Sequence, residues 1–104
     1  MASKAYVWAA CVIAAFAAPA TAETIHIEMQ NLGYNPAAVS AHVGDTVEWA
    51  NGDFLAHTAT ARSKEWDVML LPKKTGRIVL KRPGDIEYYC RFHPNMIGRI
   101  TVTE

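Results

Sequence analysis

Short apolar segments that alternate with polar residues, separated by turns, constrain the fold of this chain more than any other feature of its sequence. Residues 24–29 (T-I-H-I-E-M) alternate strictly, so three apolar side chains share one face. The turn sequences G-D at 44–45 and P-G-D at 83–85 separate further segments of this kind. After residue 22 we find no convincing amphipathic pattern of helical length. The sequence therefore predicts an all-β fold.

The spacing of these segments narrows the fold class. Residues 63–74 fit the spacing least, and we expect a loop with a helical turn there. Seven or eight short strands without helices are typical of a small antiparallel β-sandwich. The expected strands cover residues 24–29, 39–43, 46–49, 57–61, 77–81, 86–90 and 98–103.

Residues 1–22 have the pattern of a secretory signal peptide. A basic start precedes an uncharged apolar run and then P-A-T-A, whose small residues resemble an A-x-A cleavage site. The apolar run is about 14 residues long, which is short for a membrane span. We therefore expect cleavage after Ala22, a periplasmic location and no stable membrane insertion. The remaining residues, 23–104, are enough for one small domain.

The charge of the chain excludes one class of partner. Ten Lys and Arg residues balance ten Asp and Glu residues, and loss of Lys4 with the signal peptide leaves about −1. Nucleic-acid binding requires an excess of positive charge near the phosphates. We therefore expect no nucleic-acid partner.

The mature chain retains one cysteine, because Cys11 lies in the predicted signal peptide. In an oxidising compartment a lone thiol is a liability unless it is buried, paired between chains or bound to a metal. This remaining thiol, Cys90, lies in Y-Y-C-R-F-H-P-N-M, where Cys90, His93 and Met96 follow one another at three-residue steps. A fourth donor must come from another strand, and His57, which follows a turn at the start of one, is the candidate.

The types of donor distinguish between metals. Structural zinc sites use four Cys, His or carboxylate ligands, to which a thioether adds little. A thiolate, two imidazoles and a weak axial thioether form the ligand set of blue-copper electron-transfer sites. Cys90 or Met96 alone would be better explained by packing. Together with His93 at the right step, they favour copper.

On these residues the chain resembles the cupredoxins, a family of small blue copper proteins, and most closely their amicyanin and plastocyanin branch. N-L-G-Y-N-P-A-A-V-S-A-H-V-G-D-T-V-E-W is similar to the N-terminal half of the family. H-T-A-T resembles the strand with the first histidine ligand, and P-G-D-I-E-Y-Y-C-R-F-H-P-N-M-I-G-R-I-T-V resembles the copper segment. The C-x-x-H-x-x-M spacing is that of amicyanin-like members. The resemblance implies a cupredoxin-like Greek-key sandwich.

The resemblance also implies individual roles. His57, Cys90 and His93 would be the equatorial ligands of one type 1 copper ion, and Met96 would be its axial ligand. His93 would lead electrons to the surface. Tyr89 would offer a second, lateral route.

Two positions depart from the family pattern. Thr58 stands where the family commonly has an asparagine that tethers the ligand loops, and a threonine hydroxyl could substitute for it. Asn95 lies beside Met96 in a loop often richer in proline or aromatic residues. Either departure could change the reduction potential.

These features predict a periplasmic protein that shuttles single electrons between larger redox proteins. We expect a monomeric carrier rather than an enzyme, since no nucleophile–base pair or paired carboxylate cluster stands out. The main alternative is a periplasmic copper carrier or buffer that delivers the metal, although no methionine-rich or multi-histidine tail favours it. A metal-free sandwich that serves as a binding module is a third hypothesis.

Two sets of residues are candidates for contacting the electron donor and acceptor. One is an apolar patch around His93, although core packing explains most of its members equally well. The other is a group of cations that would steer an acidic partner, but a solvated strand edge explains it better. The patch comprises Leu55, Met69, Leu70, Leu71, Pro72, Pro94 and Ile97, and the cations are Lys73, Lys74, Arg77, Lys81 and Arg82. We expect His26 and His42 at the surface and Trp49 in the core.

Overall fold

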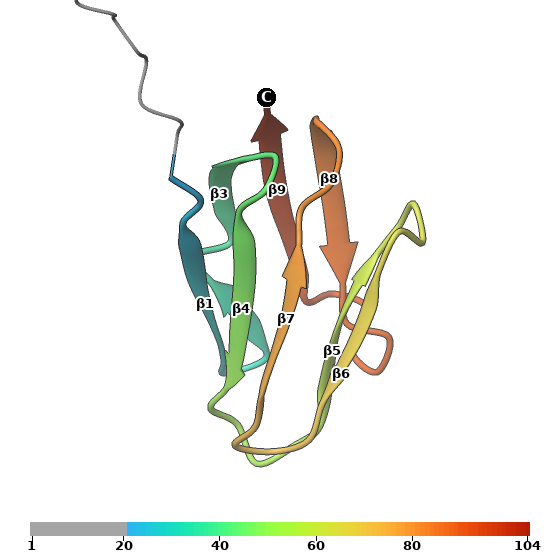
Figure 1. Cartoon of the computed structure of the whole chain (residues 1–104). Helices are drawn as coiled ribbons and strands as arrows, with labels where there is room; N and C mark the ends of the chain where they lie inside the picture. The colour runs from blue at the N-terminus through green and yellow to red at the C-terminus, as the bar shows by residue number, and fades with distance from the viewer. Residues whose placement is uncertain (1–20) are drawn as a thin grey trace, which may run out of the picture.

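Nine strands make up the fold in the computed structural model, which describes residues 21–104 (Figure 1). The predicted signal peptide lies outside the described residues except for its last two positions. Within residues 21–104 no helix is long and apolar enough to cross a membrane. The strands are β1 Thr24–Gln30, β2 Gly33–Asn35, β3 Ala38–His42, β4 Thr46–Asn51, β5 His57–Ala61, β6 Asp67–Leu70, β7 Thr75–Val79, β8 Gly84–Tyr89 and β9 Ile97–Thr103.

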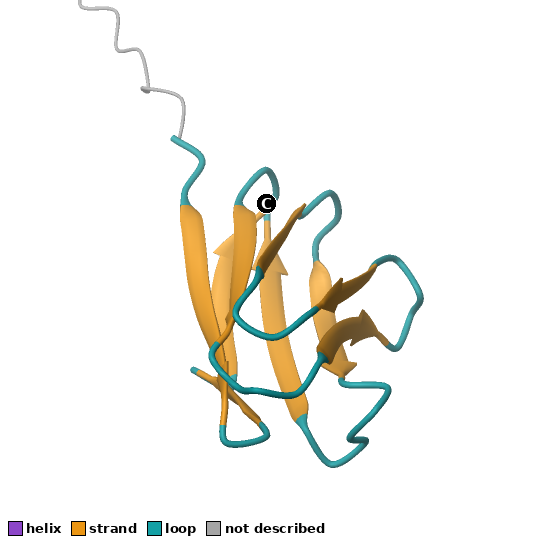
Figure 2. Cartoon of the chain, turned by 90° about the horizontal axis from the view of Figure 1, so that it is seen from below, coloured by secondary structure: helices purple, strands orange, loops and turns teal. Residues whose placement is uncertain are grey.

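The strands form two sheets that pack face to face, which confirms the predicted β-sandwich (Figures 1 and 2). The first sheet has the order β2-β1-β4-β7, and the second has the order β3-β9-β8-β5-β6. Most neighbours are antiparallel, but β1 pairs with β4 and β3 with β9 in parallel. Alternation indicates which face a strand buries but not which neighbour it joins, and the parallel pairs therefore escape prediction.

Alternating residues of both sheets fill the space between them. Ile27, Trp49, Tyr88 and Ile100 are fully buried, and the indole Nε1 of Trp49 donates to Tyr88 Oη at 3.2 Å. Trp49 is thus in the core, as predicted. The Tyr88 ring lies against Gly98 of β9, where an added Cβ would overlap the ring. A glycine is therefore required at this position to admit the tyrosine.

The expected loop with a helical turn over residues 63–74 is wrong, because Asp67–Leu70 forms β6 and pairs with β5. This strand lies at the edge of its sheet, and of its four residues only Leu70 is buried. Its sequence therefore lacks the apolar alternation of a central strand. The three-residue edge strand Gly33–Asn35 escapes prediction for a similar reason, since it is too short to show a period.

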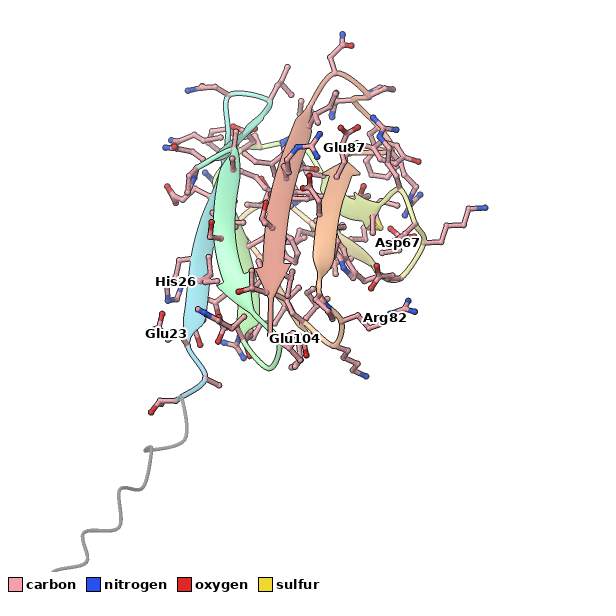
Figure 3. The ribbon with its side chains drawn as sticks, turned by 90° about the horizontal axis from the view of Figure 1, so that it is seen from above. Glu23, His26, Asp67, Arg82, Glu87 and Glu104 are labelled. Carbon is pink, nitrogen blue, oxygen red and sulfur yellow. The ribbon has the colours of Figure 1, made fainter. Side chains whose placement is uncertain are left out.

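The basic residues between 73 and 82 are all exposed, as the strand-edge interpretation predicts. Arg77 lies on the edge strand β7, and its Nε donates to Glu48 of the adjacent β4 at 2.7 Å. Arg82 lies 3.7 Å from Glu65 on the surface (Figure 3). His26 is exposed on β1, as expected, where its Nδ1 lies 3.1 Å from Glu48 (Figure 3).

Candidate metal centre

The loop between β8 and β9 places three predicted ligands on two successive turns. The His93 N–H donates to the Cys90 carbonyl at 3.2 Å, and the Met96 N–H donates to the His93 carbonyl at 2.8 Å. The Cys90 N–H in turn donates to the Met96 carbonyl at 3.1 Å and closes the loop. Pro94 is the second residue of the second turn, where its fixed φ is favourable. The three-residue steps in the sequence therefore correspond to hydrogen-bonded turns.

Strand β5 brings the fourth predicted residue to the same end of the sandwich. It pairs with β8 only through Thr60 and Ala61, so its first three residues have no partner in the β8 ladder. The Thr58 N–H donates instead to Cys90 Sγ at 3.3 Å. On the side away from its β6 partner Leu70, this divergence leaves His57 beside the thiol rather than beside a residue of β8.

His57, Cys90 and His93 converge on one point. The Nδ1 atoms of His57 and His93 lie 3.8 and 3.6 Å from Cys90 Sγ, and one donor atom from each residue lies within 4.8 Å of the others. Metal–nitrogen and metal–sulfur bonds of about 2.0 and about 2.3 Å at angles of about 110–120° would separate such donors by about 3.5–3.7 Å. The three side chains therefore fit a single metal ion with little rearrangement.

The environment of the three donors suits a bound metal. His57 and Cys90 are fully buried, and His93 is half-buried. Met96, on the same loop, is also buried. Its role as an axial ligand stays a prediction. The thiolate and imidazole donors fit copper, the cofactor predicted from the sequence.

Thr58 supplies hydrogen bonds that tether the ligand loop, the role that the family pattern gives to an asparagine. The Arg91 N–H, next to Cys90, donates to Thr58 Oγ1 at 2.9 Å. That hydroxyl lies 2.9 Å from Thr60 Oγ1, which donates to Asp67 Oδ1 at 2.7 Å. A chain of hydroxyls therefore joins the ligand loop to β5 and β6, which confirms that threonine supplies these hydrogen bonds.

Asp53 contacts a predicted ligand, although the sequence analysis did not single it out. Its Oδ2 lies 2.7 Å from His57 Nε2, and its carboxylate accepts the N–H groups of Asn31 and Leu32 at 2.9 and 3.1 Å. Burial raises the pKa of the Asp53 carboxyl, but the hydrogen bonds from His57, Leu32 and Asn31 outweigh burial and hold that pKa below its usual range. An acidic residue four positions before the histidine is the only sequence feature that pointed to it.

Tyr34 supports the site from the opposite sheet and was also missed. Its hydroxyl donates to the Thr58 carbonyl at 2.5 Å. Burial, followed by the charges of Cys90 and Tyr88, raises the pKa of Tyr34, so the phenol stays protonated and remains a donor. Thr58, the residue after His57, is thereby held through both its N–H group and its carbonyl group.

The surface beside His93 differs in part from the predicted apolar patch. Leu70 is buried in the core because it alternates inward on β6, so its predicted place in the patch is wrong. A shallow pocket next to His93 is lined by Leu32, Phe92 and Pro94, of which only Pro94 was predicted. The other predicted members are half-buried Pro72 and the exposed Leu55, Met69, Leu71, Pro94 and Ile97.

Together, the fold and the site define a β-sandwich protein with a cluster of one thiol and two imidazoles that could hold a metal ion. The sequence model of the Cupredoxin-like domain matches residues 3–102. The chain therefore belongs to the cupredoxin-like family, as the resemblance predicted.

Individual relatives agree with this assignment. A plastocyanin from Synechococcus sp. (strain JA-2-3B'a(2-13)) is 29% identical, over 81% of this chain and 76% of the plastocyanin. An amicyanin from Paracoccus versutus is 27% identical, over 83% of this chain and 70% of the amicyanin. The solved structure of a purple cupredoxin from Nitrosopumilus maritimus matches with a TM-score of 0.70 and 26% identity, over 76% of this chain and 99% of that protein.

Proposed function

We propose that the protein is a periplasmic electron carrier in which His57, Cys90, His93 and Met96 hold one type 1 copper ion. The observation that carries the proposal is the approach of two imidazole Nδ1 atoms to one buried thiol sulfur, at 3.8 and 3.6 Å. Similarity to plastocyanin and amicyanin supports an electron-transfer role. Copper, when bound, supplies a one-electron Cu(II)/Cu(I) couple.

The contribution of the chain is to keep the donor atoms in place. Backbone hydrogen bonds fix the loop from Cys90 to Met96, and the Thr58 N–H points at the sulfur. Asp53 holds the far nitrogen of His57. Because these hydrogen bonds are made within the protein, the donors need to move little when an electron is gained or lost.

His93 is the proposed electron port, since it is half-buried whereas His57 and Cys90 are fully buried. Leu32 and Phe92 lie beside it, and a small apolar surface of this kind suits a transient redox partner. We propose that donor and acceptor dock here in turn on a monomeric carrier.

Charges flank the exposed aromatic residues at this end of the sandwich. Lys73 Nζ lies 4.2 Å from the ring centre of Phe54, and Arg91 Cζ lies 5.6 Å from that of Phe92. A partner with acidic groups around an apolar centre would complement this arrangement. Tyr89, the proposed lateral route, is half-buried.

Repeated redox cycling in the presence of a copper acceptor tests the function. Copper-loaded protein is oxidised with ferricyanide and reduced with ascorbate over many cycles, together with an excess of a copper chelator. An electron carrier recovers its full blue absorption in every cycle and retains its copper. Progressive transfer of copper to the chelator at the rate of cycling would contradict electron shuttling and support the alternative, delivery of the metal. Copper analysis of the purified protein tests the third hypothesis, a metal-free binding module.

A further inference from the structure

Asp53 lies where a carboxylate can act on the metal through a ligand. We propose that Asp53 is a positioning residue for His57. Asp53 holds the imidazole with Nδ1 toward Cys90 Sγ, and its negative charge favours Cu(II) over Cu(I). The inference rests on the copper site of the proposed function and concerns how the reduction potential of that site is set.

The position of the carboxylate does not depend on His57 alone. Asp53 accepts the N–H groups of Asn31 and Leu32 in the turn between β1 and β2, at 2.9 and 3.1 Å. These two residues have φ values of 52° and 58°, as a two-residue hairpin turn requires, although this conformation is unfavourable for a bulky leucine. The Asp53 N–H also donates to Asn51 Oδ1 at 2.9 Å. Asp53 is therefore held by hydrogen bonds that do not involve His57.

The histidine side of the contact is equally constrained. The His57 side chain is fully buried, and its Nε2 lies 2.7 Å from Asp53 Oδ2. A carboxylate only accepts hydrogen bonds, so Nε2 carries the proton and Nδ1 keeps its lone pair for the metal. Among residues 21–104, His57 is the only one of the two candidate ligand histidines whose ring contacts a carboxylate; the ring of His93 lies beside Cys90 Sγ and the His57 ring.

The expected effect on copper follows from this arrangement. A carboxylate bound to the far nitrogen of a ligand imidazole makes the imidazole a stronger donor. The stronger donor and the nearby negative charge both stabilise Cu(II) more than Cu(I). Because the contact is made at a buried ring, solvent screens it less than it screens a surface carboxylate. Asp53 therefore lowers the reduction potential.

Two charge-neutralising variants separate this effect from a general loss of negative charge. Asp53→Asn removes the charge with little change of shape, and Glu87→Gln is its matched control. Glu87 lies three residues before Cys90 and pairs at the surface with Arg62 and Arg99 (Figure 3). In Asp53→Asn we expect the dissociation constant of Cu(II) to rise about tenfold relative to that of Cu(I), which equals a positive shift of about 59 mV. In Glu87→Gln we expect a change of less than about threefold. Asp53→Glu, which keeps the charge, should lie closer to the wild type.

A measurement on the wild-type apo-protein tests the geometry independently of copper and of mutant folding. Nitrogen NMR of the His57 ring should show the proton on Nε2, in slow exchange with water. Equal potential shifts in Asp53→Asn and Glu87→Gln, or a His57 proton on Nδ1, would overturn the proposal. A wild-type protein that gives no blue copper centre would contradict the proposed function instead, and the tautomer would then decide whether Asp53 positions His57.

Discussion

The turn between β3 and β4 and the loop between β4 and β5 lie at opposite ends of the sandwich (Figure 1). An aspartate holds each of them in a similar way, but only the second aspartate contacts a candidate metal ligand. Asp45, where β3 leads into β4, accepts the N–H groups of Glu23 and His42 at 2.9 and 2.8 Å. Asp53, at the other end, accepts two N–H groups of the turn between β1 and β2. In both cases one carboxylate joins the start or end of β1 to a neighbouring loop.

The difference between the two ends is one additional hydrogen bond. Asp53 also accepts from His57, whereas Asp45 accepts from two backbone N–H groups and its side-chain neighbour His42 stays 3.9 Å away. A carboxylate that fastens a loop thus becomes part of a metal site when a ligand histidine is placed within its reach. Substitutions at Asp45 should therefore change stability alone, and substitutions at Asp53 should also change the properties of copper.

The largest expected effect on stability is that of Asp45→Ala. The substitution leaves two backbone N–H groups without their acceptor at a residue that is only 4% exposed. We expect the free energy of unfolding to fall by about 2–4 kcal/mol, measured by urea denaturation of the apo-protein. The copper absorption and reduction potential should not change. A shift in potential as large as that of Asp53→Asn would break the distinction between the two ends.

Thr58→Val tests whether the Thr58 hydroxyl stabilises the end of the sandwich that carries the candidate metal site. Valine keeps the shape of threonine but removes the acceptor of the Arg91 N–H, and we expect a loss of about 1–3 kcal/mol. Thr58→Ser keeps the hydroxyl and is the control. If the valine variant is as stable as the serine variant, the hydroxyl does not hold the ligand loop.

Acidification should weaken the Asp45 end in a predictable direction. The hydrogen bonds from the Glu23 and His42 N–H groups hold the pKa of the Asp45 carboxyl below its usual range, against the effect of burial. A lowered pKa in the folded state means that the ionised carboxylate stabilises the fold above the unfolded value of about 3.9, and that this contribution is lost as the pH falls further. The stability advantage of the wild-type apo-protein over Asp45→Asn should therefore shrink below about pH 4. An advantage that stays constant down to about pH 2.5 would contradict this assignment.

The smallest effect on stability is expected at a carboxylate whose hydrogen-bond partners are side chains rather than backbone groups. Glu48 accepts from Arg77 Nε at 2.7 Å and lies 3.1 Å from His26 Nδ1, and both partners are exposed side chains. Exposed pairs of this kind contribute little to stability. The urea midpoint of Glu48→Gln should therefore fall less than that of Asp45→Asn. An equal fall would show that the type of partner does not matter.

The ligand loop could be predicted from the sequence because its chemistry is local. Cys90, His93 and Met96 follow one another within two turns, and their residue types indicate the metal without knowledge of the fold. A tethering role for Thr58 could be anticipated from the resemblance, because Thr58 stands where the family commonly has a tethering asparagine. Cys90 is the last residue of the predicted strand 86–90, and its side chain is buried.

The supports that come from distant segments could not be predicted in the same way. The carboxylate of Asp53 is held by the turn at residues 31–32, which lies beside the loop between β4 and β5, and a single sequence does not reveal this proximity. Tyr34 reaches Thr58 from the other sheet. In physical terms, sequence alternation indicates burial, whereas these contacts depend on how the sheets are stacked.

Addition of one equivalent of Cu(II) to the purified apo-protein tests the central claim, that His57, Cys90 and His93 form a thiolate-bound copper site. We predict an intense blue absorption that is retained in His26→Ala, since His26 lies exposed on β1 away from the ligand loop. The absorption should disappear in Cys90→Ser, in which the thiolate is absent. A pale adduct in the wild-type protein, or a blue colour that survives in Cys90→Ser, would contradict the account.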